Sequence, residues 1–167
     1  LSTAGAHRIV SVDLHSGQIQ GFFNGPFDHL TALPLLVGHI KKNFRRGFVI
    51  VSPDAGRVKV ADRYALKLGA DLAIVHKRRL GAGRTQALSV IGEVKNQHCV
   101  IVDDMIDTAS TVVPVATLLK DQGAKSVSVI VTHGLFSDPA TERLANSKND
   151  TLVFTDHSET TVAELAN

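Results

Sequence analysis

Short runs of apolar, often β-branched residues alternate along the chain with longer segments of helical character. The first pattern is typical of buried strands and the second of helices that pack on a sheet. Strands are predicted at residues 8–13, 48–52, 72–76, 99–103, 126–132 and 151–155. Helices are predicted at residues 30–42, 58–68, 111–122 and 140–145.

Prolines and glycines support the predicted helix boundaries. Pro34 and Pro114 fall in the first turns of their helices, where a missing N–H matters least. Gly69 and Gly123 follow the last turns, as C-terminal caps do. Strands joined by helices in this way form a parallel sheet covered on both faces. The pattern therefore predicts an α/β fold, with residues 1–167 forming a single domain around a parallel sheet.

The composition narrows the classes of function. The 167 residues are 44% hydrophobic and 20% charged, which is the profile of a globular protein with a real core. A formal net charge of +2 is too balanced to indicate nucleic-acid binding, and no apolar run reaches membrane-spanning length. Cys99 is the only cysteine and lies in an apolar strand, which indicates a packed thiol in a reducing, cytoplasmic compartment. Because Leu1 lies within what looks like a helix ending at Gly5, we expect the chain to be part of a larger polypeptide.

One segment is more informative about chemistry than the rest. The predicted strand 99–103 ends in two adjacent carboxylates, Asp103 and Asp104, and a hydroxyl-rich loop at residues 107–111 then opens a helix. Carboxylates at a strand end can hold sugar hydroxyls, and free amides at a helix start can bind phosphate. The segment predicts a site for a phosphorylated ribose. The plainer alternative is a solvated acid pair followed by a turn that only caps its helix.

Three other predicted strands end in polar clusters. These are Asp13-Leu-His15, Ser52-Pro-Asp-Ala-Gly-Arg57 and His76-Lys-Arg-Arg79. In an open parallel sheet the carboxyl ends of the strands converge on one crevice, so we expect all four clusters to lie together. They supply carboxylates, a histidine, an anion-binding turn and several cations, which suits chemistry on phosphates.

Six motifs, in order along the chain, resemble those of the ribose-phosphate diphosphokinase family, also called phosphoribosyl pyrophosphate synthetases. They are Asp13-Leu-His-Ser-Gly-Gln-Ile-Gln-Gly-Phe-Phe23, Ser52-Pro-Asp-Ala-Gly56, Lys77-Arg-Arg79, Val90-Ile-Gly-Glu-Val94, Val102-Asp-Asp-Met-Ile-Asp-Thr108 and Thr132-His-Gly134. The resemblance implies a three-layer, parallel-sheet domain of the type I phosphoribosyltransferase-like kind. It also implies transfer of a diphosphoryl group from ATP to the anomeric hydroxyl of ribose 5-phosphate, giving 5-phosphoribosyl 1-pyrophosphate and AMP for nucleotide biosynthesis.

The resemblance implies roles for the matching residues. Lys77 resembles the catalytic lysine, and Arg79 its partner on the following loop, and both would neutralise charge on the transferred phosphate. Asp103 and Asp104 would hold the ribose hydroxyls, with Arg79 also contacting ribose 5-phosphate. The 5-phosphate would be bound by the amides and hydroxyls of Asp107, Thr108, Ala109, Ser110 and Thr111. The pyrophosphate turn would consist of Ser52, Asp54, Ala55, Gly56 and Arg57.

The resemblance further implies Mg²⁺, or alternatively Mn²⁺, with His15 and Asp54 as the metal contacts. Asp54 offers the oxygen that magnesium prefers, whereas His15 is an unusual magnesium ligand and could instead be a hydrogen-bonded structural residue. The other implied properties are ATP as co-substrate and a homo-oligomer with shared active sites. Neither nucleic acid nor a membrane is expected as a partner.

Two residues depart from the family pattern. Arg57 stands where the pyrophosphate turn usually has a second glycine, and Ser110 replaces the glycine usual in the ribose-phosphate loop. If position 57 requires a positive φ, a side chain there costs about 1–2 kcal/mol; alternatively, its guanidinium adds a phosphate contact. Two further functions stay open: a non-catalytic regulatory subunit of the same synthetase, and a salvage phosphoribosyltransferase that needs no ATP.

Overall fold

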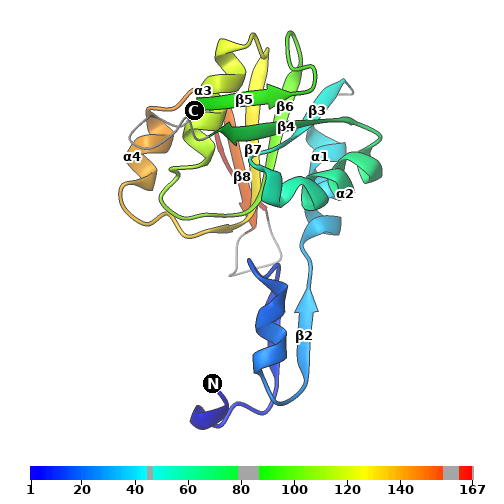
Figure 1. Cartoon of the computed structure of the whole chain (residues 1–167), viewed down its shortest axis with the longest axis vertical. Helices are drawn as coiled ribbons and strands as arrows, with labels where there is room; N and C mark the ends of the chain where they lie inside the picture. The colour runs from blue at the N-terminus through cyan, green and yellow to red at the C-terminus, as the bar shows by residue number, and fades with distance from the viewer. Residues whose placement is uncertain (45–46, 79–86, 156–161, 167) are drawn as a thin grey trace.

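The computed structural model describes residues 1–44, 47–78, 87–155 and 162–166, most of which form a sheet packed between helices (Figure 1). The sheet has seven strands in the order β5-β4-β3-β6-β7-β8-β9. Its five central strands are mutually parallel: β4 (Asp71–Arg78), β3 (Phe48–Ser52), β6 (His98–Ile106), β7 (Ser126–Gly134) and β8 (Thr151–Thr155). The predicted strands after the first are therefore confirmed as members of one parallel sheet.

The two edge strands were not predicted. β5 (Ala87–Ile91) pairs antiparallel with β4, and β9 (Val162–Ala166) pairs antiparallel with β8. The predicted parallel sheet thus carries one antiparallel strand at each edge. An edge strand has one neighbour only, so it can be joined by a simple reversal of the chain without a crossover helix.

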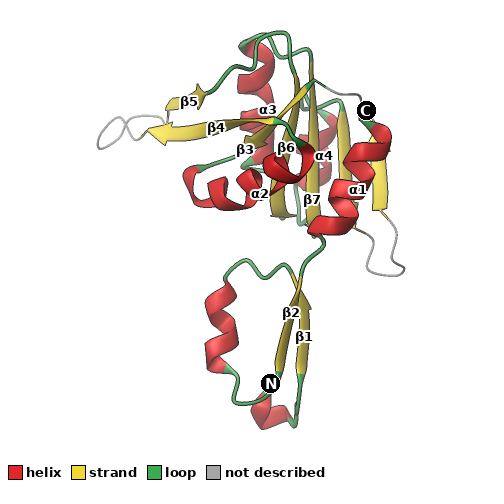
Figure 2. Ribbon diagram, turned by 90° about the vertical axis from the view of Figure 1, so that its right-hand side faces the viewer, coloured by secondary structure: helices red, strands yellow, loops and turns green. Residues whose placement is uncertain are grey.

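Two helices cover each face of the sheet, which confirms the three-layer α/β fold (Figure 2). α1 (Leu33–Asn43) and α2 (Val58–Leu68) pack on one face, and α3 (Val112–Asp121) and α4 (Ala140–Ala145) on the other. The predicted start of the first helix at residue 30 is too early, because residues 27–30 form a strand. No helix within the described ranges is long and apolar enough to cross a membrane.

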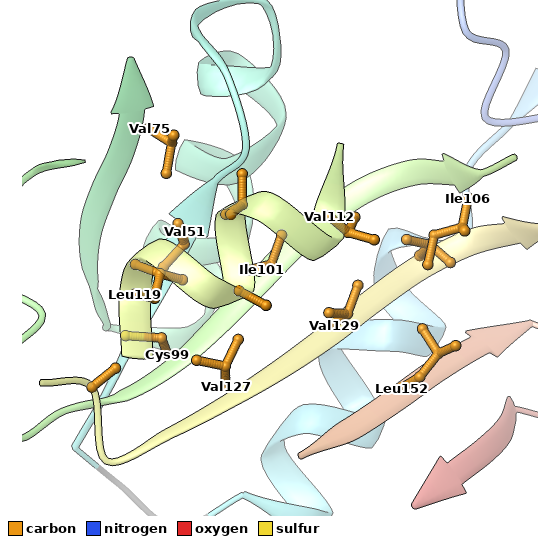
Figure 3. Packing of buried hydrophobic residues seen from close by; sticks show 14 of the residues in the cluster. Val51, Val75, Cys99, Ile101, Ile106, Val112, Leu119, Val127, Val129 and Leu152 are labelled. Carbon is orange, nitrogen blue, oxygen red and sulfur yellow. The ribbon is translucent and has the colours of Figure 1, made fainter. Parts of the chain in front are cut away.

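Alternation along the strands divides the core between the two faces, since successive strand residues point to opposite sides. On β3, Val49 and Val51 belong to the cluster beneath α3, whereas Ile50 belongs to the cluster beneath α1 and α2. Figure 3 shows the first cluster, with Leu119 of α3 lying over the apolar side chains of the central strands. These strands are buried on both faces, which is why their sequences are nearly continuous apolar runs.

The first thirty residues form an arm that projects from this body (Figures 1 and 2). It contains two 3-10 helices, η1 (Ser2–Ala4) and η2 (Gly17–Phe22), and two strands, β1 (Ile9–Val12) and β2 (Phe27–Leu30). β1 pairs with β2 in a separate two-stranded parallel sheet. The expectation that the first strand joins the main sheet is therefore wrong. Both edges of that sheet are occupied by antiparallel strands, and the apolar pattern of a strand does not specify its neighbour.

The end of the arm is fixed to the carboxyl edge of the main sheet. The Asp13 carboxylate accepts hydrogen bonds from the Ala32 amide at 3.0 Å and from the Thr132 hydroxyl at 2.8 Å. His133 Nε2 lies 2.8 Å from the Val12 carbonyl oxygen. Asp13 itself has a φ of 43°, a conformation that aspartate tolerates better than most residues. These contacts bring the residues after Asp13 to the edge of the sheet on which the other predicted clusters lie.

Candidate active site

The turn after β3 is built by its own side chains. Ser52 is fully buried and its hydroxyl donates to the Asp54 carbonyl oxygen at 2.7 Å. Asp54 Oδ1 accepts from the Arg57 amide at 3.0 Å and so caps the short 3-10 helix η3 (Ala55–Arg57) that leads into α2. Arg57 has a φ of −96°, so its position does not require glycine and the strain considered for it does not arise.

The acid pair lies inside β6 and not after its end, because the strand continues to Ile106. The Asp103 and Asp104 side chains are only 11% and 8% exposed. The Asp104 amide donates to Asp103 Oδ1 at 2.9 Å. Burial, followed by the hydrogen bond with Asp104 and its charge, raises the pKa of Asp103 to about 7, while Arg57 acts in the opposite direction. A carboxyl that titrates near neutral pH is common at functional sites.

Arg57 and His15 complete a cluster with the two carboxylates. Arg57 Nη2 donates to Asp104 Oδ2 at 2.6 Å, and its Nε lies 3.3 Å from Asp103 Oδ1. His15 Nδ1 lies 2.8 Å from Asp104 Oδ2 and 2.5 Å from Arg57 Nη2. The cluster therefore joins three segments that are distant in sequence: the arm, the turn that follows β3, and strand β6.

The loop between β6 and α3 presents unpaired amides. Within the described part of the chain, no hydrogen bond uses the backbone N–H of any residue from Thr108 to Val112. The positive end of the α3 dipole adds to these donors, which together favour an anion. Ala109, and not Ser110, has the left-handed conformation, with a φ of 58°. The replacement at Ser110 therefore puts no side chain at a strained position.

Arg143 is a contributor to this loop that the sequence analysis missed. Its Nη1 donates to the Thr108 carbonyl oxygen at 2.9 Å and so fixes the loop to α4. An arginine on a short polar helix carries no sequence signal for such a contact. The contact depends on the tertiary structure, which places Ala140 and Leu144 of α4 in the same apolar cluster as Ile106 and Val112.

A cavity of about 210 Å³ unites most of the predicted site. Its lining comprises His15, Asp54, Arg57 and residues 103–112. Ser52 lies buried beneath the turn, and Ala55 and Gly56 do not line the cavity. Lys77 lies within β4, beyond the part of that strand that pairs with β3, while Arg79 falls outside the described residues. The described lining carries the carboxylates of Asp54, Asp103, Asp104 and Asp107 against the single guanidinium of Arg57.

A second, smaller cavity of about 130 Å³ shares Arg57, Asp103 and Asp104 with the first and was not predicted. Asp13, His29, Arg63 and Tyr64 are among its lining residues. Burial, followed by the charge of Asp13, raises the pKa of Tyr64, so this phenol stays protonated at neutral pH. Arg57 therefore lines both cavities.

The donor set of the first cavity suits magnesium better than a structural metal. Within the described ranges, no three His, Cys, Asp or Glu side chains are grouped so that they could hold a metal by themselves. Magnesium rarely uses such a group, because it keeps several waters and is bound through one or two carboxylates together with substrate phosphates. Asp54 and His15 line the same cavity, and the Asp54 carboxylate fits this mode of binding.

Comparisons with known proteins identify the family of this chain. A model of the phosphoribosyl synthetase-associated domain family matches residues 79–166. The ribose-phosphate pyrophosphokinase of Streptomyces coelicolor is 54% identical over 158 residues, which cover 93% of this chain and 49% of that protein. That of Aquifex aeolicus is 46% identical over 156 residues, covering 93% and 50%. The chain thus spans about half the length of these curated relatives.

Solved structures give the same result at the level of the fold. The crystal structure of phosphoribosylpyrophosphate synthetase from Mycobacterium smegmatis superposes with a TM-score of 0.85 at 47% identity, covering 93% of this chain and 50% of that one. Orotate phosphoribosyltransferase from Aeropyrum pernix superposes with a TM-score of 0.59 at 22% identity, covering 74% of this chain and 67% of that one. The second likeness concerns the fold alone and supports the type I phosphoribosyltransferase-like architecture.

Proposed function

Since this chain belongs to the phosphoribosyl synthetase-associated domain family, we propose that it carries the ribose 5-phosphate site and the catalytic cations of a ribose-phosphate diphosphokinase. The reaction is transfer of a diphosphoryl group from ATP to the anomeric hydroxyl of ribose 5-phosphate, with AMP as the second product. One observation carries the proposal: a buried acid pair and a row of unpaired amides line the same cavity.

The two ends of this cavity suit the two ends of a sugar phosphate. A carboxylate can accept about four hydrogen bonds, so Asp103 and Asp104 retain acceptors for two adjacent ribose hydroxyls beside their contacts with Arg57. At the other end, the amides of residues 108–112 and the hydroxyls of Thr108, Ser110 and Thr111 would bind the 5-phosphate. Asp107, an anion itself, would contribute only its backbone.

The charge of the cavity supports a divalent cation. A phosphate dianion entering a cavity with four carboxylates and one guanidinium in its described lining meets a net repulsion. Mg²⁺, held by Asp54 and His15, would neutralise charge on the phosphates of both substrates. Lys77 and Arg79 would add cations on the transferred diphosphoryl group, where positioning and neutralisation do most of the catalytic work.

The remaining parts of the proposal rest on the family. They are ATP as co-substrate, a homo-oligomer with shared active sites, a cytoplasmic location, and residues 1–167 acting as one phosphoribosyltransferase-like domain. The single cysteine, buried in β6, agrees with a reducing compartment.

Calorimetric titration with ribose 5-phosphate in the presence of Mg²⁺ tests the site. The wild-type chain should bind ribose 5-phosphate, and Asp103→Asn should weaken binding about tenfold, because a neutral amide is a poorer acceptor for sugar hydroxyls. Asp28→Asn is the matched control: it removes one carboxylate from an ion pair with Arg8 on the arm and should leave binding unchanged. An unchanged dissociation constant for Asp103→Asn would contradict the assignment of the ribose site.

Phosphorus NMR with ATP, Mg²⁺ and ribose 5-phosphate tests the reaction. Phosphoribosyl pyrophosphate and AMP should form together, and Lys77→Ala should reduce turnover far more than it reduces ribose 5-phosphate affinity, because the lysine is assigned to the transition state. Equal losses of turnover and affinity would remove that role from Lys77.

A further inference from the structure

Arg57 occupies the centre of the cluster described above. Its side chain is 16% exposed and lines both cavities. Its Nη2 lies 2.5 Å from His15 Nδ1 and 2.6 Å from Asp104 Oδ2, while its backbone amide is held by Asp54. A single residue thus contacts both residues assigned to the metal and both residues assigned to the ribose.

Hydrogen-bond chemistry indicates that Arg57 acts in this cluster as a cation between two acceptor atoms. A guanidinium can only donate, so a hydrogen bond from Arg57 to His15 uses the tautomer in which Nδ1 is the acceptor. The same Nδ1 then cannot donate to Asp104 Oδ2, which lies 2.8 Å away. In this tautomer, His15 Nδ1 and Asp104 Oδ2 both direct lone pairs toward the same position. Arg57 Nη2 occupies that position. Lone pairs of these two kinds are also what a divalent cation such as Mn²⁺ binds.

We propose that Arg57 is a positioning residue that serves as a resident cation of the ligand-free site, where its guanidinium lies between His15 and Asp104 and competes for His15 with the divalent metal assigned to His15 and Asp54. The proposal deepens the proposed function and rests on it for the metal's role in the reaction. The guanidinium of Arg57 and a divalent metal beside His15 would repel each other strongly in a partly buried site. Metal binding therefore requires Arg57 Nη2 to move away from His15. The substrate phosphates are assigned to the first cavity, which Arg57 also lines, and they would be the new partner of the displaced guanidinium.

Titration of the protein with Mn²⁺ alone, followed by the EPR signal of the free ion, tests this competition. Arg57→Ala should bind Mn²⁺ about tenfold more tightly than the wild-type chain, because it keeps the ligand atoms and loses the competing cation. Arg57→Lys, which keeps the charge, should stay close to the wild-type affinity. Arg8→Ala is the matched control, since it removes the same charge from an ion pair of 2.6 Å on the arm, and it should not change the affinity.

A double variant locates the effect. Arg57→Ala combined with His15→Ala should lose the gain in Mn²⁺ affinity, and retention of the gain would place the metal elsewhere and overturn the proposal. Equal or weaker Mn²⁺ binding by Arg57→Ala, with its fold intact by circular dichroism, would also overturn it. Because neither ATP nor ribose 5-phosphate is present, the result is independent of the calorimetric test: failure of ribose 5-phosphate binding counts against the proposed function alone.

Discussion

Asp103 makes the stability of this protein depend on pH in a direction opposite to that of most paired carboxylates. Its pKa is raised from an ordinary 3.8 to about 7, chiefly by burial. Between these two values the folded chain holds a proton that the unfolded chain releases, so the free energy of unfolding falls as the pH rises. The contribution is complete below pH 3.8 and is lost as the pH passes through 7.

The magnitude follows from the width of this pH window. One pKa unit corresponds to about 1.4 kcal/mol, so the slope reaches at most about 1.4 kcal/mol per pH unit and the whole effect about 4 kcal/mol. Asp103→Asn cannot titrate. The free energy of unfolding of this variant, minus that of the wild type, should therefore rise between about pH 4 and 7 and stay constant above 7.

Urea denaturation at constant ionic strength, from pH 4.5 to 8.5, measures this difference, and urea is preferable because it carries no charge and does not screen the cluster. Asp28→Asn again controls for the loss of one exposed, ion-paired carboxylate, and its difference from the wild type should not reproduce the rise. A difference between Asp103→Asn and the wild type that stays constant over the whole range would refute the reasoning. It would mean that Asp103 is already ionised in the folded protein at acidic pH.

Two further predictions concern the loop and the core. Arg143→Ala should lower the free energy of unfolding by about 0.5–1.5 kcal/mol in urea and weaken ribose 5-phosphate binding in calorimetry, because it frees the Thr108 carbonyl that holds the phosphate loop. An unchanged affinity would mean that the loop keeps its shape without α4. Cys99 is 1% exposed and burial raises the pKa of its thiol to about 11, so a thiol reagent at pH 8 should label it only as fast as the chain unfolds. Rapid labelling of the folded protein would contradict this burial.

Local sequence determined the central part of the fold and of the site. The apolar runs that became β3, β6 and β7 are buried on both faces, and such a strand needs little information beyond its own residues. The loop at residues 107–111 was also predictable, because a strand followed by hydroxyl-bearing residues and a helix leaves amides free wherever the helix lies.

Tertiary structure alone decided the neighbours of these elements. β1 has the apolar pattern of a core strand, yet it pairs with β2 in the arm, because the pattern records the preference of a strand for burial and not the identity of its partner. The contacts of Arg57 with His15 and Asp104 span 42 and 47 residues of sequence. A hydrogen bond or ion pair depends on distance in space. That distance is set only when the arm, strand β6 and the turn that follows β3 pack together at one edge of the sheet.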